Sequence, residues 1–142
     1  MRYGASTFIW VSPFSSKTLN LLDKAKAFGF DIVEICVEDP DMLNAASIRA
    51  RADKAGVALT VCGAFGPSRD LSSEAAAVRG TALAYLKRCI DYAALLGSPF
   101  VSGPMYAAVG ATASERAAQW ARRRGPQRSR GLRGRTIGQA CH

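Results

Sequence analysis

Glu34 is a carboxylate in the interior of an apolar, strand-like run, the segment FDIVEICV at residues 30–37. A carboxylate near the end of a strand could anchor a substrate hydroxyl, or it could orient the ligand of a metal ion through a hydrogen bond. It could equally form a structural ion pair with a neighbouring strand or loop. The residues leave both interpretations of Glu34 open.

More carboxylates follow that strand in the acidic loop Glu38-Asp39-Pro40-Asp41. Oxygen ligands at this density resemble the donor set that holds a hard divalent cation. A solvated loop leading to a helix cap explains the same residues, and we prefer that interpretation.

The segment LTVCGAFGPSRDLSS at residues 59–73 joins a short apolar run to a helix that we expect Ser72-Ser73 to open. Its glycine-rich turn, GAFGP at residues 63–67, could direct backbone N–H groups at an oxyanion or a phosphate. The glycine spacing matches neither the P-loop nor the dinucleotide-binding fingerprint. We therefore interpret these glycines as residues that let the chain turn at the end of a strand.

Aromatic residues near expected strand ends could stack on the face of a sugar: Trp10, Phe14, Phe65 and Tyr106. Packing in the core would explain each of them equally well. Phe14 and Phe65 are expected in loops, so these two favour binding over packing.

The histidine and cysteine content excludes several chemistries. The sole histidine is His142, so residues 1–121 cannot form a metal site that contains histidine, a Ser-His-Asp triad or a Cys-His pair. The four cysteines show no paired spacing: Cys36, Cys62, Cys89 and Cys141. The first three of them lie inside apolar segments. We interpret them as reduced core cysteines of a cytoplasmic protein.

Apolar runs alternate with amphipathic segments along residues 1–121. We expect four strands, at residues 3–10, 30–37, 57–61 and 99–103. We expect four helices: after Ser15 or Ser16 as far as Phe28, from Asn44 to Ala55, from about Glu74 to Leu96, and from Thr112 through Trp120. Gly29, Gly56 and Gly97 are placed to end the first three helices. Strands that alternate with helices predict a parallel sheet with right-handed crossovers. Because a (β/α)8 barrel needs about 250 residues, the four βα units predict an α/β fold that is the N-terminal half of a TIM barrel.

The net charge of +8 is concentrated at the C-terminal end. All 11 acidic residues lie at or before Glu115, whereas seven of the 19 basic residues lie in residues 122–142, so residues 1–121 are nearly neutral. We expect a domain over residues 1–121 and an irregular Arg/Gly-rich tail over residues 122–142. One interpretation is a basic tail that binds nucleic acid. The other is that the tail belongs to no fold, because a frameshift or fragment boundary lies near residue 121. The abrupt end of the last amphipathic helix favours the second interpretation. No apolar run reaches the roughly 18 residues of a membrane span, and we expect no membrane partner.

Taken together, four stretches resemble the sugar phosphate isomerase/epimerase superfamily, whose fold is the xylose isomerase-like TIM barrel. They are FGFDIVEI at 28–35, LTVCGAFGPSRDLSS at 59–73, VRGTALAYLKRCIDYAALLGSP at 78–99 and VSGPMYAAVG at 101–110. Within the superfamily they are most similar to the D-tagatose 3-epimerase group, also called D-psicose or ketose 3-epimerases. The resemblance covers residues 1 to about 121 and corresponds to the N-terminal half of that barrel.

The resemblance implies a metal-assisted epimerisation at C3 of a free ketose through an enediolate, with Mn²⁺ or Mg²⁺ as the cofactor. It also implies that the two catalytic glutamates and the other metal ligands belong to the second half of the barrel. We therefore assign no catalytic residue and no metal ligand in this chain, and we expect it to be inactive alone.

The half that is present supplies pocket wall in that group. The matching positions are Ser6, Phe8, Phe14, Ala64, Gly103, Pro104 and Val109, and we add Glu34 as a possible anchor for a sugar hydroxyl. Ser6 stands where relatives often carry an aromatic residue, and Val109 stands where some carry tryptophan. The particular ketose is therefore left open.

Two other classes of protein remain as alternatives. A DNA-repair hydrolase similar to endonuclease IV would use the same barrel, but it needs histidine and acidic ligands on early strands, and residues 1–121 contain no histidine. A non-enzymatic half-barrel would self-associate through its open sheet edges, or it would bind a polyanion through the basic tail.

Overall fold

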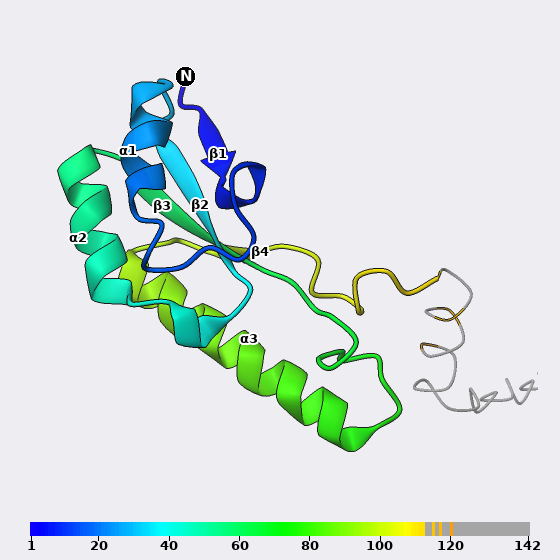
Figure 1. Cartoon of the computed structure of the whole chain (residues 1–142). Coiled ribbons are helices and arrows are strands. Elements are labelled where there is room, and N and C mark those ends of the chain that lie inside the picture. The colour runs from blue at the N-terminus through cyan, green and yellow to red at the C-terminus, as the bar shows by residue number, and fades with distance from the viewer. Residues whose placement is uncertain (113–114, 116, 118–119, 121–142) are drawn as a thin grey trace, which may run out of the picture.

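The computed structural model describes residues 1–112, 115, 117 and 120. In this part of the chain a parallel sheet of four strands, in the order β1-β2-β3-β4, carries helices between successive strands (Figure 1). The strands are β1 (Gly4–Ser6), β2 (Ile32–Val37), β3 (Ala58–Gly63) and β4 (Val101–Ser102). The helices are α1 (Asn20–Ala27), α2 (Ala45–Ala55) and α3 (Ala76–Leu96), with short 3-10 helices η1 (Thr7–Ile9) and η2 (Pro40–Met42). The predicted α/β class with four βα units is confirmed.

The hydrophobic core lies between the sheet and the helices. Val33, Ile35 and Val37 of β2 are buried there, next to Leu59 and Val61 of β3. Successive side chains of a strand point to opposite faces, so the intervening residues of these strands lie on the other face. Within the described residues that second face is covered by no helix, and its positions include half-buried polar side chains.

The ends of α2 follow the predicted signals. The Asn44 side-chain oxygen accepts a hydrogen bond from the Ser47 amide at 2.9 Å, which satisfies one of the free N–H groups of the first turn. Gly56 then ends the helix with φ of 73°, a left-handed conformation that glycine adopts without steric strain. The predicted cap and stop of this helix are confirmed.

The first strand is shorter than the predicted range of residues 3–10. It ends at Ser6, and residues 7–9 form η1. Thr7 is fully buried, and its hydroxyl oxygen accepts a hydrogen bond from the Cys36 amide at 3.2 Å. This bond draws the chain off the sheet edge and prevents β1 from continuing through Phe8.

The first helix begins at Asn20 and is not capped by Ser15 or Ser16. Ser15 and Thr18 close a turn, because the Ser15 amide donates to the Thr18 hydroxyl at 3.1 Å and that hydroxyl donates to the Ser15 carbonyl at 2.8 Å. The Ser16 hydroxyl instead accepts from the Asn44 amide at 2.7 Å. Phe28, the predicted last residue of this helix, is 64% exposed.

The start of α3 also departs from the prediction, since Ser72-Ser73 do not cap it. Both the amide and the hydroxyl of Ser72 donate to the buried Asp70 carboxylate, at 2.7 and 2.6 Å. The residue that precedes α3 is Ala75, which has no side-chain cap. The buried Asp70 turn therefore ends the loop, and the helix begins a few residues later.

The helix predicted from Thr112 begins with a capping box. The Glu115 amide donates to the Thr112 hydroxyl at 3.2 Å, and the Thr112 amide donates to the Glu115 carboxylate at 2.8 Å. Glu115, Ala117 and Trp120 are helical. The predicted tail over residues 122–142, including Cys141, lies outside the described residues.

The cysteines within the described residues are free thiols, and all three are buried: Cys36, Cys62 and Cys89. The prediction of reduced core cysteines is confirmed for these three. No helix of the described residues has both the length and the apolar character that crossing a membrane would need.

Tyr85 joins α3 to the ends of two strands. Its hydroxyl donates to the Val37 carbonyl at the end of β2 and accepts from the Ala64 amide after β3, the latter at 3.0 Å. The side chain is buried, and burial raises the pKa of the phenol above its ordinary value.

We expect Tyr85→Phe to lower the free energy of unfolding by about 1–3 kcal/mol, because the buried Val37 carbonyl and the half-buried Ala64 amide would lose their partner. Urea denaturation of the whole chain followed by circular dichroism measures the change. Tyr106→Phe is the matched control, since Tyr106 is 62% exposed and should change stability little. Equal effects of the two substitutions would contradict the structural role of Tyr85.

Candidate functional site

The loops that follow β3 and β4 are paired through their backbones. The Phe65 amide donates to the Pro104 carbonyl at 3.2 Å, and the Val109 amide donates to the Phe65 carbonyl at 3.1 Å. These bonds bring together three residues expected to form pocket wall: Ala64, Pro104 and Val109. In parallel α/β sheets this edge, at the carboxyl ends of the strands, is where ligands bind.

Arg69 holds the loop after β3 in place. Its guanidinium donates to the carbonyls of Ala64 and Glu38, each at 3.0 Å, and lies 4.1 Å from the centre of the Tyr85 ring. The sequence interpretation missed both supporting residues. Tyr85 could have been found, because it falls at helical spacing between the buried residues Ala82 and Cys89. No local signal marks Arg69.

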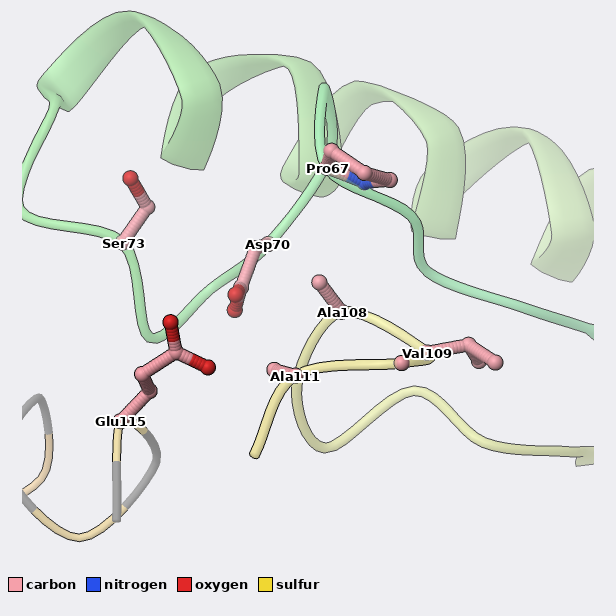
Figure 2. Close-up of a pocket in the computed structure, with 8 residues that line it drawn as sticks. Pro67, Asp70, Ser73, Ala108, Val109, Ala111 and Glu115 are labelled. Carbon is pink, nitrogen blue, oxygen red and sulfur yellow. The ribbon is translucent and has the colours of Figure 1, made fainter. Parts of the chain in front are cut away.

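An open hollow of about 410 Å³ lies between these two loops. It is lined by Pro67, Asp70, Ser73, Ala108, Val109, Gly110, Ala111 and Glu115. Figure 2 shows the Asp70 and Glu115 carboxylates directed toward the same space. Hydrogen bonds from the Thr112 hydroxyl and amide lower the pKa of the Glu115 carboxyl below its ordinary value. Each carboxylate also accepts hydrogen bonds from its own loop, Asp70 from Ser72 and Glu115 from Thr112.

A second hollow, of about 390 Å³, lies on the uncovered face of the sheet. It is lined by Gly4, Ala5, Ser6, Ile32, Glu34, Thr60, Phe100 and Ser102. The Ser102 hydroxyl donates to the Glu34 carboxylate at 3.0 Å, across the sheet from β4 to β2. Among the described residues Glu34 forms no ion pair. Two predicted site residues, Ser6 and Glu34, meet at this hollow.

Two thiols lie on the same face as Glu34, one residue before the ends of β2 and β3. The Ser6 hydroxyl is 3.1 Å from the Cys36 sulfur. Hydrogen bonds from the Cys62 thiol, and from Ser6, Thr7 and the Phe8 amide, lower the pKa of the Cys36 thiol to about 7, against the opposing effect of burial. The same thiol pair, together with burial, raises the pKa of Cys62. Of the two thiols, Cys36 is therefore the one whose pKa is lowered.

The aromatic residues are divided between surface and core. Phe14 and Phe65 are 0% and 2% exposed and belong to the hydrophobic core, so in this structure they do not offer a ring face to a ligand. The interpretation that their loop positions favour binding is corrected accordingly: both loops fold back onto the core. Phe8, on η1, is 43% exposed and stays accessible beside Ser6.

The acidic loop is engaged in local structure. The Asp39 carboxylate accepts from the Asp41 amide at 2.9 Å, and the Asp41 carboxylate accepts from Arg88 of α3 at 2.8 Å. Glu38 accepts from the Ser12 hydroxyl at 2.6 Å. These carboxylates point to different partners, which agrees with the preferred interpretation of a solvated loop.

The parallel strands, the helices that connect them and a site at the carboxyl strand ends define a βα-barrel type of protein. A family model described as "Xylose isomerase-like TIM barrel" matches residues 22–125, and the chain belongs to this family. It is 29% identical over 115 residues to a probable ketose 3-epimerase of Synechocystis sp., covering 81% of this chain and 40% of the relative. It is 31% identical over 111 residues to a D-psicose 3-epimerase of Agrobacterium fabrum, covering 75% of this chain and 38% of the relative. The chain thus spans about two fifths of the length of these curated relatives.

Solved structures show the same fold. A D-psicose 3-epimerase crystallised in the presence of D-fructose is similar with a TM-score of 0.71 and 27% identity, over 86% of this chain and 44% of that one. A D-allulose 3-epimerase of Methylomonas sp. in complex with D-allulose has a TM-score of 0.72 at 20% identity, over 84% and 43%. The match to less than half of each barrel agrees with the predicted half-barrel.

The residues present do not fit the Mn²⁺ or Mg²⁺ that the resemblance implies. Among the described residues, the group of three or more metal-ligating side chains that converge is Glu34, Cys36 and Cys62. Mn²⁺ and Mg²⁺ favour carboxylate, carbonyl and water oxygens, whereas this group is dominated by sulfur. No step of a reaction through such an ion is derived from these residues.

Gly103, another predicted wall residue, marks a close approach of β4 to β3. It has φ of 115°, and a Cβ atom placed there would lie 2.0 Å from the Gly63 carbonyl oxygen and 2.8 Å from the Cys62 sulfur. Only glycine fits without moving the backbone. The approach places the Cys62 thiol under the start of the loop after β4.

We expect Gly103→Ala to lower the free energy of unfolding by about 3 kcal/mol or more, because strain at positive φ and a backbone clash act together. Gly110→Ala is the matched control. Gly110 also has a positive φ, of 92°, but a Cβ atom added there would meet no neighbouring atom within 4 Å. Strain alone, of about 1 kcal/mol, is therefore expected for the control. Thermal and urea unfolding of both variants measure the difference, and equal losses would show that the close approach is not present in solution.

Proposed function

We propose that this chain supplies the substrate-facing wall of a ketose 3-epimerase-like sugar isomerase. The observation that supports this most directly is the match of 75% to 81% of the chain to relatives named as ketose and D-psicose 3-epimerases. Of its predicted wall residues, Val109 lines the hollow between the loops, and Ser6 and Glu34 line the hollow on the uncovered face of the sheet. The substrate class that fits is a free ketose.

In this proposal each element of the wall has a distinct task. Glu34, oriented by the Ser102 hydroxyl, accepts a hydrogen bond from a sugar hydroxyl at the uncovered face of the sheet. Ser6, beside it at the end of β1, can donate or accept. The exposed ring of Phe8 packs against an apolar face of the sugar. Ala64, Pro104 and Val109 limit the space at the rim through the paired loops.

The groups that move the C3 proton belong, in this proposal, to the remainder of the barrel. The resemblance implies glutamates and a bound divalent ion there, which would stabilise the enediolate. We also propose that the barrel unit of this chain covers residues 1–121 and that residues 122–142 lie outside it.

The purified 142-residue chain should not interconvert D-fructose and D-psicose, with or without added Mn²⁺ or Mg²⁺. Incubation at high protein concentration followed by chromatographic separation of the sugars measures this. The A. fabrum D-psicose 3-epimerase serves as the positive control. Turnover by the chain alone, removed by Glu34→Gln, would contradict the assignment of the proton-moving groups to the remainder of the barrel.

A chimaera in which residues 1–112 replace the matching segment of the A. fabrum enzyme should epimerise a ketose. In that chimaera Phe8→Ala should raise KM roughly fivefold with kcat little changed, as expected for about 1 kcal/mol of lost ring contact. Phe28→Ala is the matched control, because Phe28 is also an exposed phenylalanine but precedes β2, away from the strand's carboxyl end. A folded chimaera that binds no ketose would refute the proposed wall.

A further inference from the structure

Cys36 and Cys62 occupy directly opposed positions on neighbouring strands. They are register partners in the parallel pair of β2 and β3, and both side chains lie on the face of the sheet that faces away from the helices. Neighbouring strands are about 4.8 Å apart, so the two sulfur atoms start from adjacent positions. Neither thiol forms a disulfide.

Glu34 brings a third ligand atom to the same place. It precedes Cys36 by two residues on β2, so its side chain lies on the same face. A carboxylate oxygen of Glu34 and the two sulfur atoms all lie within 4.8 Å of one another. The three donors therefore converge on one place in the fold.

We propose that Cys36, Cys62 and Glu34 bind a thiophilic divalent cation of the Zn²⁺ type. Tetrahedral Zn²⁺ with bonds of about 2.3 Å to sulfur places two thiolates about 3.8 Å apart, which matches thiols on adjacent strands. Two sulfur ligands and one oxygen ligand suit Zn²⁺, Cd²⁺ or Co²⁺ and disfavour Mg²⁺. This site goes beyond the proposed sugar function and differs in its donors from the ion implied by the resemblance.

The surroundings of the three ligands suit a site with one open position. Glu34 lines the hollow of about 390 Å³ on the uncovered face, together with Ser6 and Ser102. Cys36 is fully buried and Cys62 is 6% exposed, so an ion enters from the side of the carboxylate. Three protein ligands leave the fourth tetrahedral position for a water molecule or a ligand in this hollow.

Neighbouring hydroxyl groups orient the ligands. The Ser102 hydroxyl donates to Glu34 Oε1 at 3.0 Å, which fixes the carboxylate from behind. The Ser6 hydroxyl lies 3.1 Å from the Cys36 sulfur and can donate to a thiolate there. Such outer hydrogen bonds raise the metal affinity of a site by about 10- to 100-fold. A purely packing role for the two thiols would not require the carboxylate to converge on them.

The test uses the whole chain with Cys141→Ser and His142→Ala, so that the terminal thiol and imidazole cannot bind the probe. Titration of the reduced, metal-free protein with Co²⁺ is followed by visible absorption, since thiolate ligands give an intense charge-transfer band and tetrahedral geometry gives strong d–d bands. We expect saturation at a single Co²⁺ per chain. Displacement by Zn²⁺ then removes the bands, and added Mg²⁺ leaves them unchanged.

Substitutions assign the ligands. Cys36→Ser and Cys62→Ser should each abolish the tetrahedral thiolate spectrum, and Glu34→Gln should weaken Co²⁺ binding and change the d–d bands. Ser102→Ala should weaken binding roughly tenfold while retaining the spectrum, as expected for a residue that positions Glu34. Cys89→Ala is the matched control: Cys89 is a buried free thiol outside the group, and its removal should leave binding unchanged.

Circular dichroism of each variant separates loss of binding from loss of the fold. If a cysteine variant does not fold, the metal site is tested instead by thiol protection in the protein that keeps all three cysteines. Bound Zn²⁺ should shield Cys36 and Cys62, but not Cys89, from alkylation during partial unfolding. Mass spectrometry identifies which thiols are alkylated. The absence of a thiolate band, or a band that persists without Cys36 and Cys62, would overturn the proposal. Because none of these measurements uses a sugar, failure of the metal site and failure of the epimerase proposal are distinguishable.

Discussion

The register of β2 against β3 is the constraint on which the other features depend. The two strands pair in parallel from Ile32 with Ala58 to Val37 with Gly63. In this alignment Val33, Ile35 and Val37 of β2 lie beside Leu59 and Val61 of β3 in the core beneath the helices. It also places Glu34, Cys36 and Cys62 on the uncovered face. A slip of one residue would exchange the two sets, burying a carboxylate among helices and exposing the core.

The carboxyl ends of the strands are held mainly by one helix. From α3, Tyr85 binds the last carbonyl of β2 and the first amide after β3, and Tyr92 donates its hydroxyl to the carbonyls of Pro40 and Leu43 at 2.7 and 2.9 Å. Arg88 binds Asp41 on the same side. The loops around the site thus depend on side chains spaced along a single rigid element. That dependence explains why the loops pack closely although they contain little regular structure.

Much of the architecture could be predicted from sequence because its signals are local. Asn44 and Gly56 mark the ends of α2 through bonds and backbone angles that involve only near neighbours. The failures at Thr7, Ser15 and Ser72 share one cause: each hydroxyl serves a turn or a neighbouring strand instead of the expected helix or strand. Which partner a small polar side chain chooses depends on tertiary contacts, and no local pattern contains that information.

The site was only partly predictable for the same reason. Glu34 was found because a carboxylate is conspicuous inside an apolar run, and Ser6 was found because it matches a wall position of the family that the sequence resembles. The convergence of Cys36 with Cys62 was missed, since residues 26 positions apart become neighbours only when the register is known. Each lies one residue before the end of its strand, which is the signal that could have paired them. Phe14 and Phe65 misled because a loop position does not prevent a ring from folding into the core.

Arg69 has a consequence for how this chain could vary. Its side chain closes a ring with the carbonyl of Ala64, while a second nitrogen reaches the carbonyl of Glu38. Insertion or deletion between residues 64 and 69 would change the size of that ring and pull the guanidinium away from Tyr85. The buried Asp70 turn extends the restriction to Ser72. The Arg79 guanidinium, which donates to the carbonyls of Ser73 and Glu74, continues the restriction to the start of α3, so the length of this loop is fixed along nearly its whole course.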